Sequence, residues 1–193
     1  INGVLFGLNQ KNYHIGGFNA YIECSIPRNV GLGSSANFDI MIGTIINHLY
    51  NEGQIENKYL VQIGRFATNT FYCKPSGLMN ECVCCVGGFI KVDFKDFNSP
   101  DIYKLNIDFS NFDYTLCSVN SNLIRSDTTA DYDAVPAEMI KVAHFFKKDV
   151  LREVSYDEFM KNYRIVRSRV GDRPALRALH FFKEEERVLK QSE

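Results

Sequence analysis

The feature that most constrains the fold is a glycine- and serine-rich turn between two segments of different periodicity. The turn reads Pro-Arg-Asn-Val-Gly-Leu-Gly-Ser-Ser-Ala over residues 27–36. Before it, residues 18–26 alternate apolar and other side chains, which predicts a strand with one buried face. After it, apolar residues recur every three or four positions over residues 38–49, which predicts a core-facing helix that ends before Gly53. A strand, a glycine turn and a buried helix are therefore expected in succession.

Downstream of this helix the periodicity continues to change along the chain. A second helix is predicted over residues 57–71, because apolar residues again fall on one side and Pro75 prevents its continuation. Residues 82–94 read as a buried segment that is broken at Gly87-Gly88. Two further strands are predicted, over the alternating residues 103–109 and over residues 114–120.

The last third of the chain has helical periodicity from about residue 134 onward. Pro136 suits the first turn of one helix, because a first turn does not need the N–H that proline lacks. Ser155 and Glu158 have the spacing of a capping box, and Pro174 opens a final charged helix that ends near Lys190. The order of elements predicts an α+β chain, with the polar stretch 120–133 as the place where a second lobe begins.

Composition excludes several classes of protein. At 193 residues, with 45% hydrophobic and 23% charged side chains, the chain has the composition of one ordinary folded domain, or one plus a fragment, and not of a disordered protein. Its longest apolar stretch, residues 82–90, is too short for a membrane-spanning helix, which predicts no membrane segment. A net charge of −1 predicts no nucleic-acid partner and leaves the oligomeric state open.

The six cysteines lie mainly within apolar runs, which favours a reducing, cytoplasmic compartment over a disulfide framework. The run Cys82-Val83-Cys84-Cys85 is interpreted as core and not as a metal site, because no second Cys/His pair follows at zinc spacing. The basic cluster Arg164, Arg167, Arg169 and Arg173 is interpreted as a solvated helical surface. The start at Ile1, within an apparent element and without a signal-type core, suggests a piece of a longer protein.

The glycine-serine turn is the segment that carries chemistry. Glycines let the backbone approach an anion, and the unpaired N–H groups and dipole of a helix's first turn can hold a phosphate. The hydroxyls of Ser34 and Ser35 can bind a phosphate or ligate magnesium. A turn with a serine N-cap and no ligand explains the same residues, so from the residues alone both interpretations stay open.

The string PRNVGLGSSANFD resembles the phosphate-loop motif of the GHMP kinases, which is Pro, three variable residues and Gly-Leu-(Gly/Ser)-Ser-Ser-Ala. Every fixed position is present. Among these kinases the chain looks most like the galactokinases. The string KPSGLMNECVCCVGG resembles their Pro-Cys-Gly-Ile-Met-Asp-Gln segment, and SVNSNLIRSDTTADY resembles their Asn-Ser-Asn…Ser-Glu-Tyr segment. The resemblance runs in register along nearly the whole chain.

The resemblance implies transfer of the ATP γ-phosphoryl group to the anomeric hydroxyl of galactose, with ATP and a monosaccharide as partners and Mg²⁺ as cofactor. It implies a sugar site that contains Gly77, Asn80 and Tyr132. It makes Ser35 the magnesium ligand. The phosphate-binding residues that it implies are Gly31, Leu32, Gly33, Ser34, Ser35 and Ala36.

Two departures from the family pattern weaken the expectation of catalysis. The aspartate of the sugar site falls on Asn80, which can hydrogen-bond a hydroxyl but cannot take its proton. The acidic second magnesium ligand falls on Thr68, which removes a formal charge from the metal site. The family's N-terminal sugar motif and C-terminal glycine-rich motif also lie outside these 193 residues.

The resemblance implies a two-layer α+β fold of the GHMP kinase type (ribosomal protein S5 domain 2-like) over residues 1–120. It implies the helical start of a ferredoxin-like C-terminal domain over residues 121–193. The function expected is that of a galactokinase-like sugar 1-phosphotransferase, weak or inactive. The alternatives are a non-catalytic nucleotide- or sugar-binding pseudokinase of the same fold and a purely structural fragment.

Overall fold

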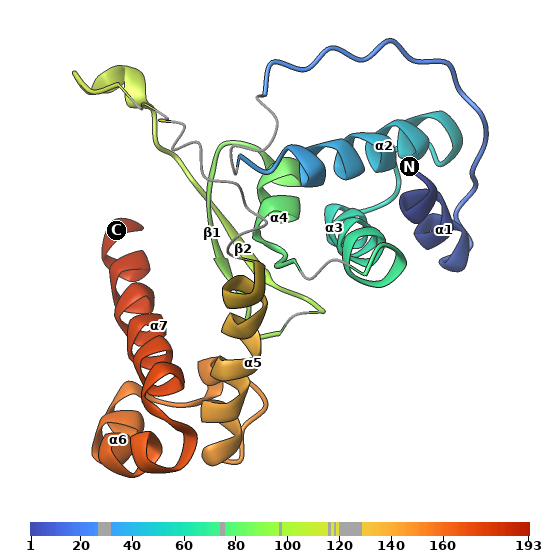
Figure 1. Ribbon diagram of the computed structural model, residues 1–193. Helices are drawn as coiled ribbons and strands as arrows, with labels where there is room; N and C mark the ends of the chain where they lie inside the picture. Colours follow the sequence, from blue (N-terminus) through green and yellow to red (C-terminus); the bar gives the residue numbers. More distant parts are fainter. Residues whose placement is uncertain (27–31, 74–75, 97, 116, 118, 120–128) are drawn as a thin grey trace. The chain divides into compact units, whose positions relative to one another are not determined.

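The computed structural model describes residues 1–26, 32–73, 76–96, 98–115, 117, 119 and 129–193 (Figure 1). Its described residues fall into two compact units. The first contains residues 1–92 and 98–121, and the second contains residues 93–97 and 122–193. Each unit has its own hydrophobic core.

The first unit is built mainly from four helices. These are α1 (Asn2–Gln10), α2 (Ser34–Tyr50), α3 (Asn57–Phe66) and α4 (Met79–Val86). A single π-helical turn, η1 (Ala67–Phe71), continues α3. The helices predicted over residues 38–49 and 57–71 are therefore confirmed. Part of the segment predicted as buried, residues 82–86, belongs to α4, and its chain breaks at Gly87-Gly88 as predicted.

Apolar faces of α1, α2 and α3 meet in the core of the first unit. Ile42, Ile46 and Leu8 are fully buried there. Asn47 of α2 holds the loop between α2 and α3 against the helix, because its side chain makes two hydrogen bonds with the backbone of Ile55, at 2.9 and 3.1 Å. These buried bonds satisfy polar groups that would otherwise destabilise the core. The buried members of the core are Val4, Leu8, Ile40, Ile42, Ile46, Ile55, Leu60, Ile63 and Ala67.

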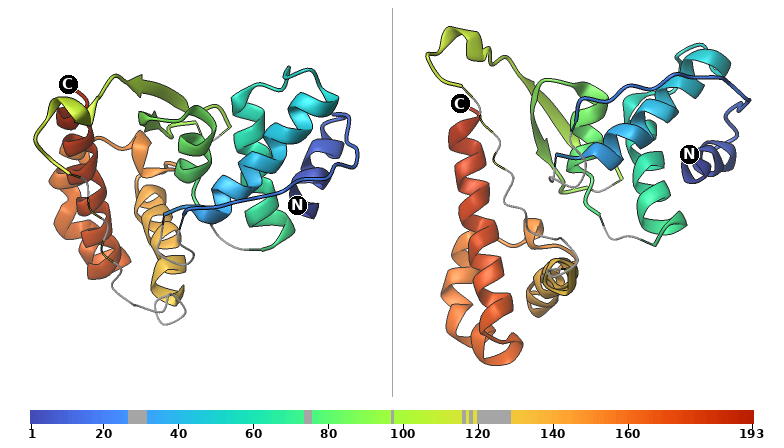
Figure 2. Two further views of the ribbon diagram at one scale, coloured as in Figure 1. Left: turned by 90° about the horizontal axis from the view of Figure 1, so that it is seen from above. Right: turned by 45° about the horizontal axis from the view of Figure 1, so that its top comes forward.

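The sheet is smaller than the sequence predicts. Strands β1 (Phe89–Asp93) and β2 (Asp101–Leu105) form a two-stranded sheet. Residues 18–25 form no strand: they are extended, largely exposed, and run over α2 from the end of α1 (Figure 2). The prediction of a strand there is wrong. Alternation indicates only which face of a strand would be buried, and among the described residues no strand lies beside this segment to form a hydrogen-bonded ladder with it.

Two other strand predictions need correction. Only the first part of residues 103–109 is in a strand, because β2 ends at Leu105 and a 3-10 turn, η2 (Phe109–Asn111), follows. The side chain of Asp108 starts that turn by accepting hydrogen bonds from the backbone and hydroxyl of Ser110. In the predicted strand 114–120, residues 114, 115, 117 and 119 are not in a strand, and residues 116, 118 and 120 lie outside the described residues.

The second unit is helical in its described part. It contains α5 (Thr129–Phe145), the 3-10 turn η4 (Leu151–Glu153), α6 (Tyr156–Val170) and α7 (Asp172–Gln191). The predicted cap of α6 is confirmed, because the Ser155 hydroxyl accepts a hydrogen bond from the backbone N–H of Glu158 at 3.1 Å. The predicted helix that contains Pro174 is also confirmed. Pro136 lies inside α5 and not in its first turn, because this helix begins before the apolar periodicity does.

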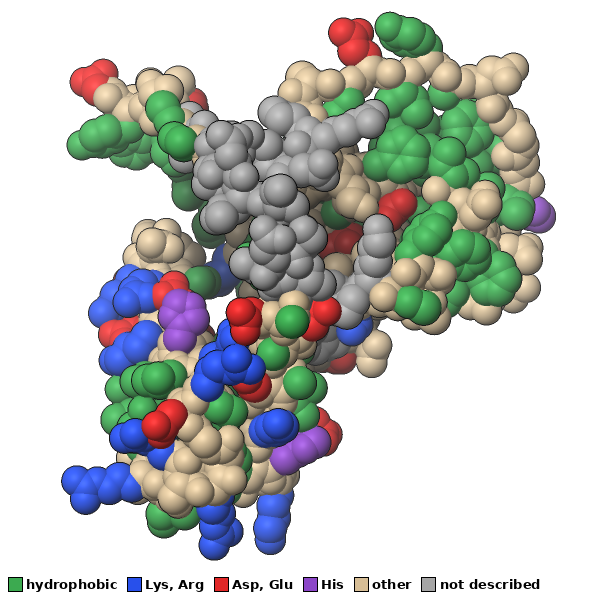
Figure 3. Space-filling view, viewed as in Figure 1, with side chains coloured by type: hydrophobic (Ala, Val, Ile, Leu, Met, Phe, Trp, Pro, Cys, Tyr) green, Lys and Arg blue, Asp and Glu red, His purple; other side chains and the backbone are tan. Residues whose placement is uncertain are grey.

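Aromatic and aliphatic side chains hold the second unit together. Phe159 of α6 is fully buried, and its ring centre lies 5.1 Å from that of Phe182 on α7. Glu138 of α5 is buried and ion-paired with Arg173 and Arg177 of α7. The basic cluster of residues 164–173 lies on an exposed helical surface, as predicted, and Figure 3 shows acidic side chains interspersed with basic ones on these helices.

The α+β class is confirmed in its coarse form, as helices with one small sheet. The ferredoxin-like start of a second domain stays a prediction, because the described residues after 122 form only helices and a 3-10 turn. Across the described residues, every helix is too short or too polar to span a bilayer.

Candidate functional site

The N-terminus of α2 begins directly after a glycine in the left-handed conformation. Gly33 precedes the helix with φ +69° and ψ +21°, in the left-handed region that glycine adopts without strain. The first helical hydrogen bond runs from Asn37 N–H to the Gly33 carbonyl. Among the described residues no side chain caps the helix, and unpaired N–H groups of a helix's first turn can bind an anion.

The predicted phosphate-binding residues around this end are in different environments. Leu32 and Ser35 are exposed, Ser34 is half-buried, and Ala36 is buried in the unit. Both hydroxyls are therefore carried by the first turn of α2. Gly31 lies outside the described residues.

A second helix begins beside the first. Asn80 occupies the second position of α4 and is exposed. A Cβ placed on Gly33 would lie 3.4 Å from Asn80 Cγ and 3.6 Å from its Oδ1. The structure thus brings the amide of Asn80 to the start of α2, and two helix N-termini, each with partial positive charge, meet at one place.

A hydrogen-bonded clasp joins the π turn to the segment before α4. The Asn69 side chain accepts hydrogen bonds from the backbone N–H and hydroxyl of Ser76, at 2.8 and 2.9 Å, and donates one to the Ser76 carbonyl at 3.0 Å. Gly77 follows in an exposed position with open space around it. Asn69 is not among the site residues predicted from the sequence; the tendency of Asn side chains to hydrogen-bond nearby backbone is the signal that could have identified it.

Thr68 is engaged within the protein. Its hydroxyl donates a hydrogen bond to Asp39 Oδ2 at 3.3 Å, so it faces inward from the π turn toward α2. Asp39 is buried, as is Glu81, which directly follows Asn80. The carboxylates near the N-terminus of α2 are therefore inside the unit, while the exposed position beside it carries the neutral Asn80.

Burial controls the ionisation of these acids. Loss of water raises the pKa of Asp39, and the hydrogen bond from Thr68 offsets part of this effect. Burial also raises the pKa of Glu81, and the nearby charge of Asp39 adds to the increase. Burial raises the pKa of Cys82 to about 11 and that of Cys85 to about 12, so both are uncharged core thiols at neutral pH. The interpretation of this run as core is confirmed for Cys82, and Cys84 and Cys85 pack partly buried against the core.

The residues present do not fit a two-ligand magnesium site of the implied kind. Ser35 offers one neutral hydroxyl, and the hydroxyl of Thr68 is already bonded to Asp39. Magnesium in proteins is usually held by one or two carboxylates. Within the described residues no three His, Cys, Asp or Glu side chains are grouped so that they could hold a metal ion.

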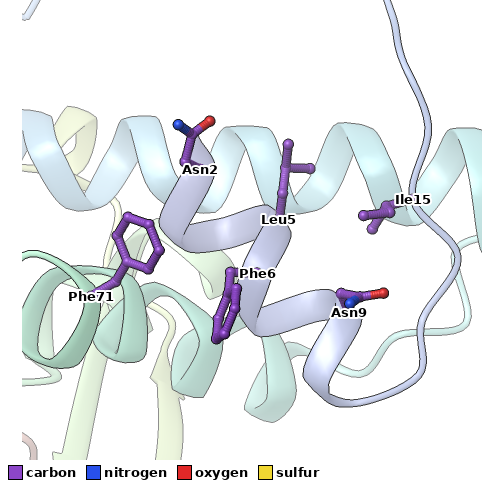
Figure 4. Close-up of a pocket in the computed structure, with 6 residues that line it drawn as sticks. All are labelled: Asn2, Leu5, Phe6, Asn9, Ile15 and Phe71. Carbon is purple, nitrogen blue, oxygen red and sulfur yellow. The ribbon is translucent and has the colours of Figure 1, made fainter.

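Tyr132, the remaining predicted sugar-site residue, lies on α5 of the second unit and is 63% exposed. The first unit alone therefore brings together Gly33, Ser34, Ser35 and Asn80, with Gly77 on the segment that leads into α4. A cavity of about 310 Å³ in this unit is lined by other residues (Figure 4). These are Asn2, Leu5, Phe6, Asn9, Ile15 and Phe71.

Comparison with known proteins gives matches over this same region. Residues 3–88 match the family described as "GHMP kinases N terminal domain". The chain is 29% identical over 189 residues to a galactokinase of Clostridium tetani, covering 96% of this chain and 47% of that protein. It is 28% identical over 180 residues to galactokinases of Lacticaseibacillus paracasei and Lacticaseibacillus casei, covering 91% of this chain and 45% of each relative.

The chain thus spans about half the length of the curated relatives it matches. The matched residues 3–88 include α2, α3, α4 and the turn that precedes α2. The resemblance seen in the sequence is confirmed: residues 3–88 carry the match to the GHMP kinase N-terminal domain, and most of this chain is similar to galactokinases.

Proposed function

We propose that this chain carries the phosphate-binding part of a galactokinase-like sugar kinase, which transfers the ATP γ-phosphoryl group to a monosaccharide hydroxyl, galactose being the substrate that the relatives' name supplies. The observation that carries the proposal is the meeting of two helix N-termini at Gly33 and Asn80. Such a place favours phosphate, because backbone N–H groups and both helix dipoles point toward the same anion.

Each polar group around the N-termini of α2 and α4 has a role in the proposed function. The N–H groups of the first turn of α2 bind phosphate oxygens, with the hydroxyls of Ser34 and Ser35 as additional donors. Asn80 hydrogen-bonds the sugar hydroxyl and orients it, but cannot accept its proton as an aspartate would. Phosphoryl transfer depends chiefly on positioning and charge stabilisation, so a site without a base can retain slow turnover.

A second function, nucleotide binding without catalysis, is favoured by one observation. Thr68 stands where the resemblance implies a magnesium-binding acid, and its hydroxyl is bonded to Asp39 inside the unit. A chain that holds nucleotide phosphates but provides few ligands for the metal suits a pseudokinase that senses its ligand. Whether magnesium strengthens nucleotide binding distinguishes the two functions.

The test is calorimetric titration of the 193-residue chain with ATP, with and without magnesium. Saturable binding that magnesium strengthens supports the kinase, and binding that is indifferent to magnesium supports the pseudokinase. Ser35→Ala is expected to weaken binding severalfold, whereas Ser192→Ala, far along the chain near its C-terminal residue, serves as the control. Absence of saturable binding up to millimolar ATP contradicts both functions for this chain.

A further inference from the structure

Another pocket of the first unit lies between the end of α1, one face of α3 and the segment just before β2. Its volume is about 570 Å³, within the range of roughly 300–1,000 Å³ that small-molecule sites occupy. Its lining shares no residue with the N-termini of α2 and α4, where ATP is proposed to bind. The pocket is therefore a separate candidate for a ligand site.

Close packing of α1 against α3 forms the floor of this pocket. Gly7 of α1 permits the close approach, because a Cβ there would lie only 3.1 Å from both Ile63 Cγ2 and Phe66 Cδ1 of α3. The Gln62 side chain, on the same face of α3, donates a hydrogen bond to the Asn98 carbonyl at 3.3 Å. This bond holds the segment before β2 in place as the remaining wall.

Two lysines of the lining lie over one aromatic ring. The Nζ atom of Lys11, directly after α1, lies 5.5 Å from the centre of the Tyr59 ring. The Nζ atom of Lys58, in the first turn of α3, lies 4.9 Å from the same centre. Tyr59 packs half-buried against the core of the unit, so the ring has a fixed place. Both ammonium groups are thus gathered at the same end of the pocket.

The positive charge at this end is only partly balanced. Lys58 pairs with Glu56 at 2.9 Å, but the two side chains are 47% and 63% exposed, and an ion pair in water contributes little. Within the described part of the chain Lys11 is in no ion pair. The N-terminal end of α3 adds partial positive charge, which a lysine in the first turn reinforces. The other lining residues are uncharged, so this end of the pocket favours an anion.

The polar side chains of the lining indicate what the rest of the ligand carries. Gln10, Asn98 and Ser99 present two amides and a hydroxyl, which can donate to and accept from the hydroxyl groups of a ligand. A phosphate ester carries a charge of about −1.5 to −2 at neutral pH, so it matches two ammonium groups better than a single carboxylate does. Lysine binds phosphate as a point charge and needs no fixed fork geometry.

We propose that this pocket binds the phosphate ester of a small hydroxylated molecule, such as a sugar phosphate. Lys11 and Lys58 hold the phosphate, and the side chains of Gln10, Asn98 and Ser99 hydrogen-bond the hydroxyl groups. The proposal goes beyond the proposed function and does not require it, because none of these residues belongs to the N-termini of α2 and α4.

The test is calorimetric titration of the 193-residue chain with galactose 1-phosphate at low ionic strength, where saturable binding is expected. Lys11→Gln and Lys58→Gln should each raise the dissociation constant about tenfold, because each removes one charge-assisted contact to the phosphate. Lys161→Gln removes the same charge at an exposed position of α6 and is the matched control, which should bind as the parent does. Absence of saturable binding to the parent would overturn the proposal.

Ser35→Ala distinguishes this pocket from the proposed ATP site. It should leave the affinity for galactose 1-phosphate unchanged. If Ser35→Ala loses that affinity and the two lysine variants keep it, the ligand lies at the N-terminus of α2 and the pocket is wrongly assigned. Failure of ATP to bind the parent would contradict the proposed function and leave this pocket standing.

Two further measurements test the location and the chemistry of the ligand. Amide hydrogen exchange should slow over residues 57–62 when galactose 1-phosphate is added, and slowing over residues 33–37 instead would contradict the proposal. Inorganic phosphate should bind more weakly than the ester, because it lacks the hydroxyl groups that the amides and Ser99 bind. Equal affinity for the two would overturn the assignment of a hydroxylated ester.

Discussion

Replacing Gly33 with alanine isolates the contribution of the left-handed turn that precedes α2. A Cβ at this position would lie 3.4 Å from Asn80 Cγ, which is an ordinary contact, so no steric clash is introduced. The cost comes from φ +69°, a conformation that costs a residue with a Cβ roughly 1–2 kcal/mol. Alanine also restricts the backbone of the unfolded chain more than glycine does, and this stabilises the folded state by roughly 0.4–1 kcal/mol. A net destabilisation of about 1 kcal/mol is expected.

Thermal unfolding followed by circular dichroism measures this effect. A change of 1 kcal/mol corresponds to a lower midpoint by roughly 2–4 °C for a chain of 150–250 residues. Gly33→Asn should lose less, because asparagine adopts the left-handed region more readily. ATP affinity should fall with Gly33→Ala, since relaxing the strain turns the first N–H groups of α2 away from the anion. Unchanged midpoint and affinity in Gly33→Ala would refute the geometry assigned to this turn.

Three further predictions concern packing, capping and charge. Gly3→Ala should lower the free energy of unfolding, measured by denaturant titration, by about 1 kcal/mol, because the new Cβ would lie 2.9 Å from the Cβ of Ala67. Gly17→Ala should change it little, because Gly17 has open space around it. Ser155→Ala removes the cap of α6 and should cost about 1 kcal/mol in chemical unfolding of the second unit. Asn80→Asp should raise the thermal midpoint slightly through the helix dipoles and weaken ATP binding measured calorimetrically without magnesium.

The helices could be predicted from the sequence because their periodicity is a local property. Residues 38–49 and 57–71 carry apolar side chains at intervals that fit one helix face, and that face is the core in the structure. Strands are different, because alternation over residues 18–26 says nothing about what lies beside the chain. A strand needs a neighbour with free backbone groups, and among the described residues only β1 and β2 supply that to each other.

The candidate site was predictable in its parts and not in its arrangement. The motif around Gly33 and the residue Asn80 were both identified from the sequence, but their proximity depends on how α4 packs beside α2. The inward orientation of Thr68 was not predictable, because it follows from a π turn that shifts the helix register after Phe66. The clasp of Asn69 on Ser76 depends on the same turn.

The distribution of charge around the site links these observations. The two positions at which the resemblance implies acids carry Asn80 and Thr68, so the proposed phosphate site has two fewer acidic side chains than the resemblance implies. The negative charge that remains nearby belongs to Asp39 and Glu81, which are buried and have raised pKa values. An anion at the two helix ends therefore meets no exposed carboxylate among these four residues, and it needs a bridging cation less than it would beside two exposed acids. In the proposed site, the two residues that stand where the resemblance implies acids thus favour the binding of phosphate itself.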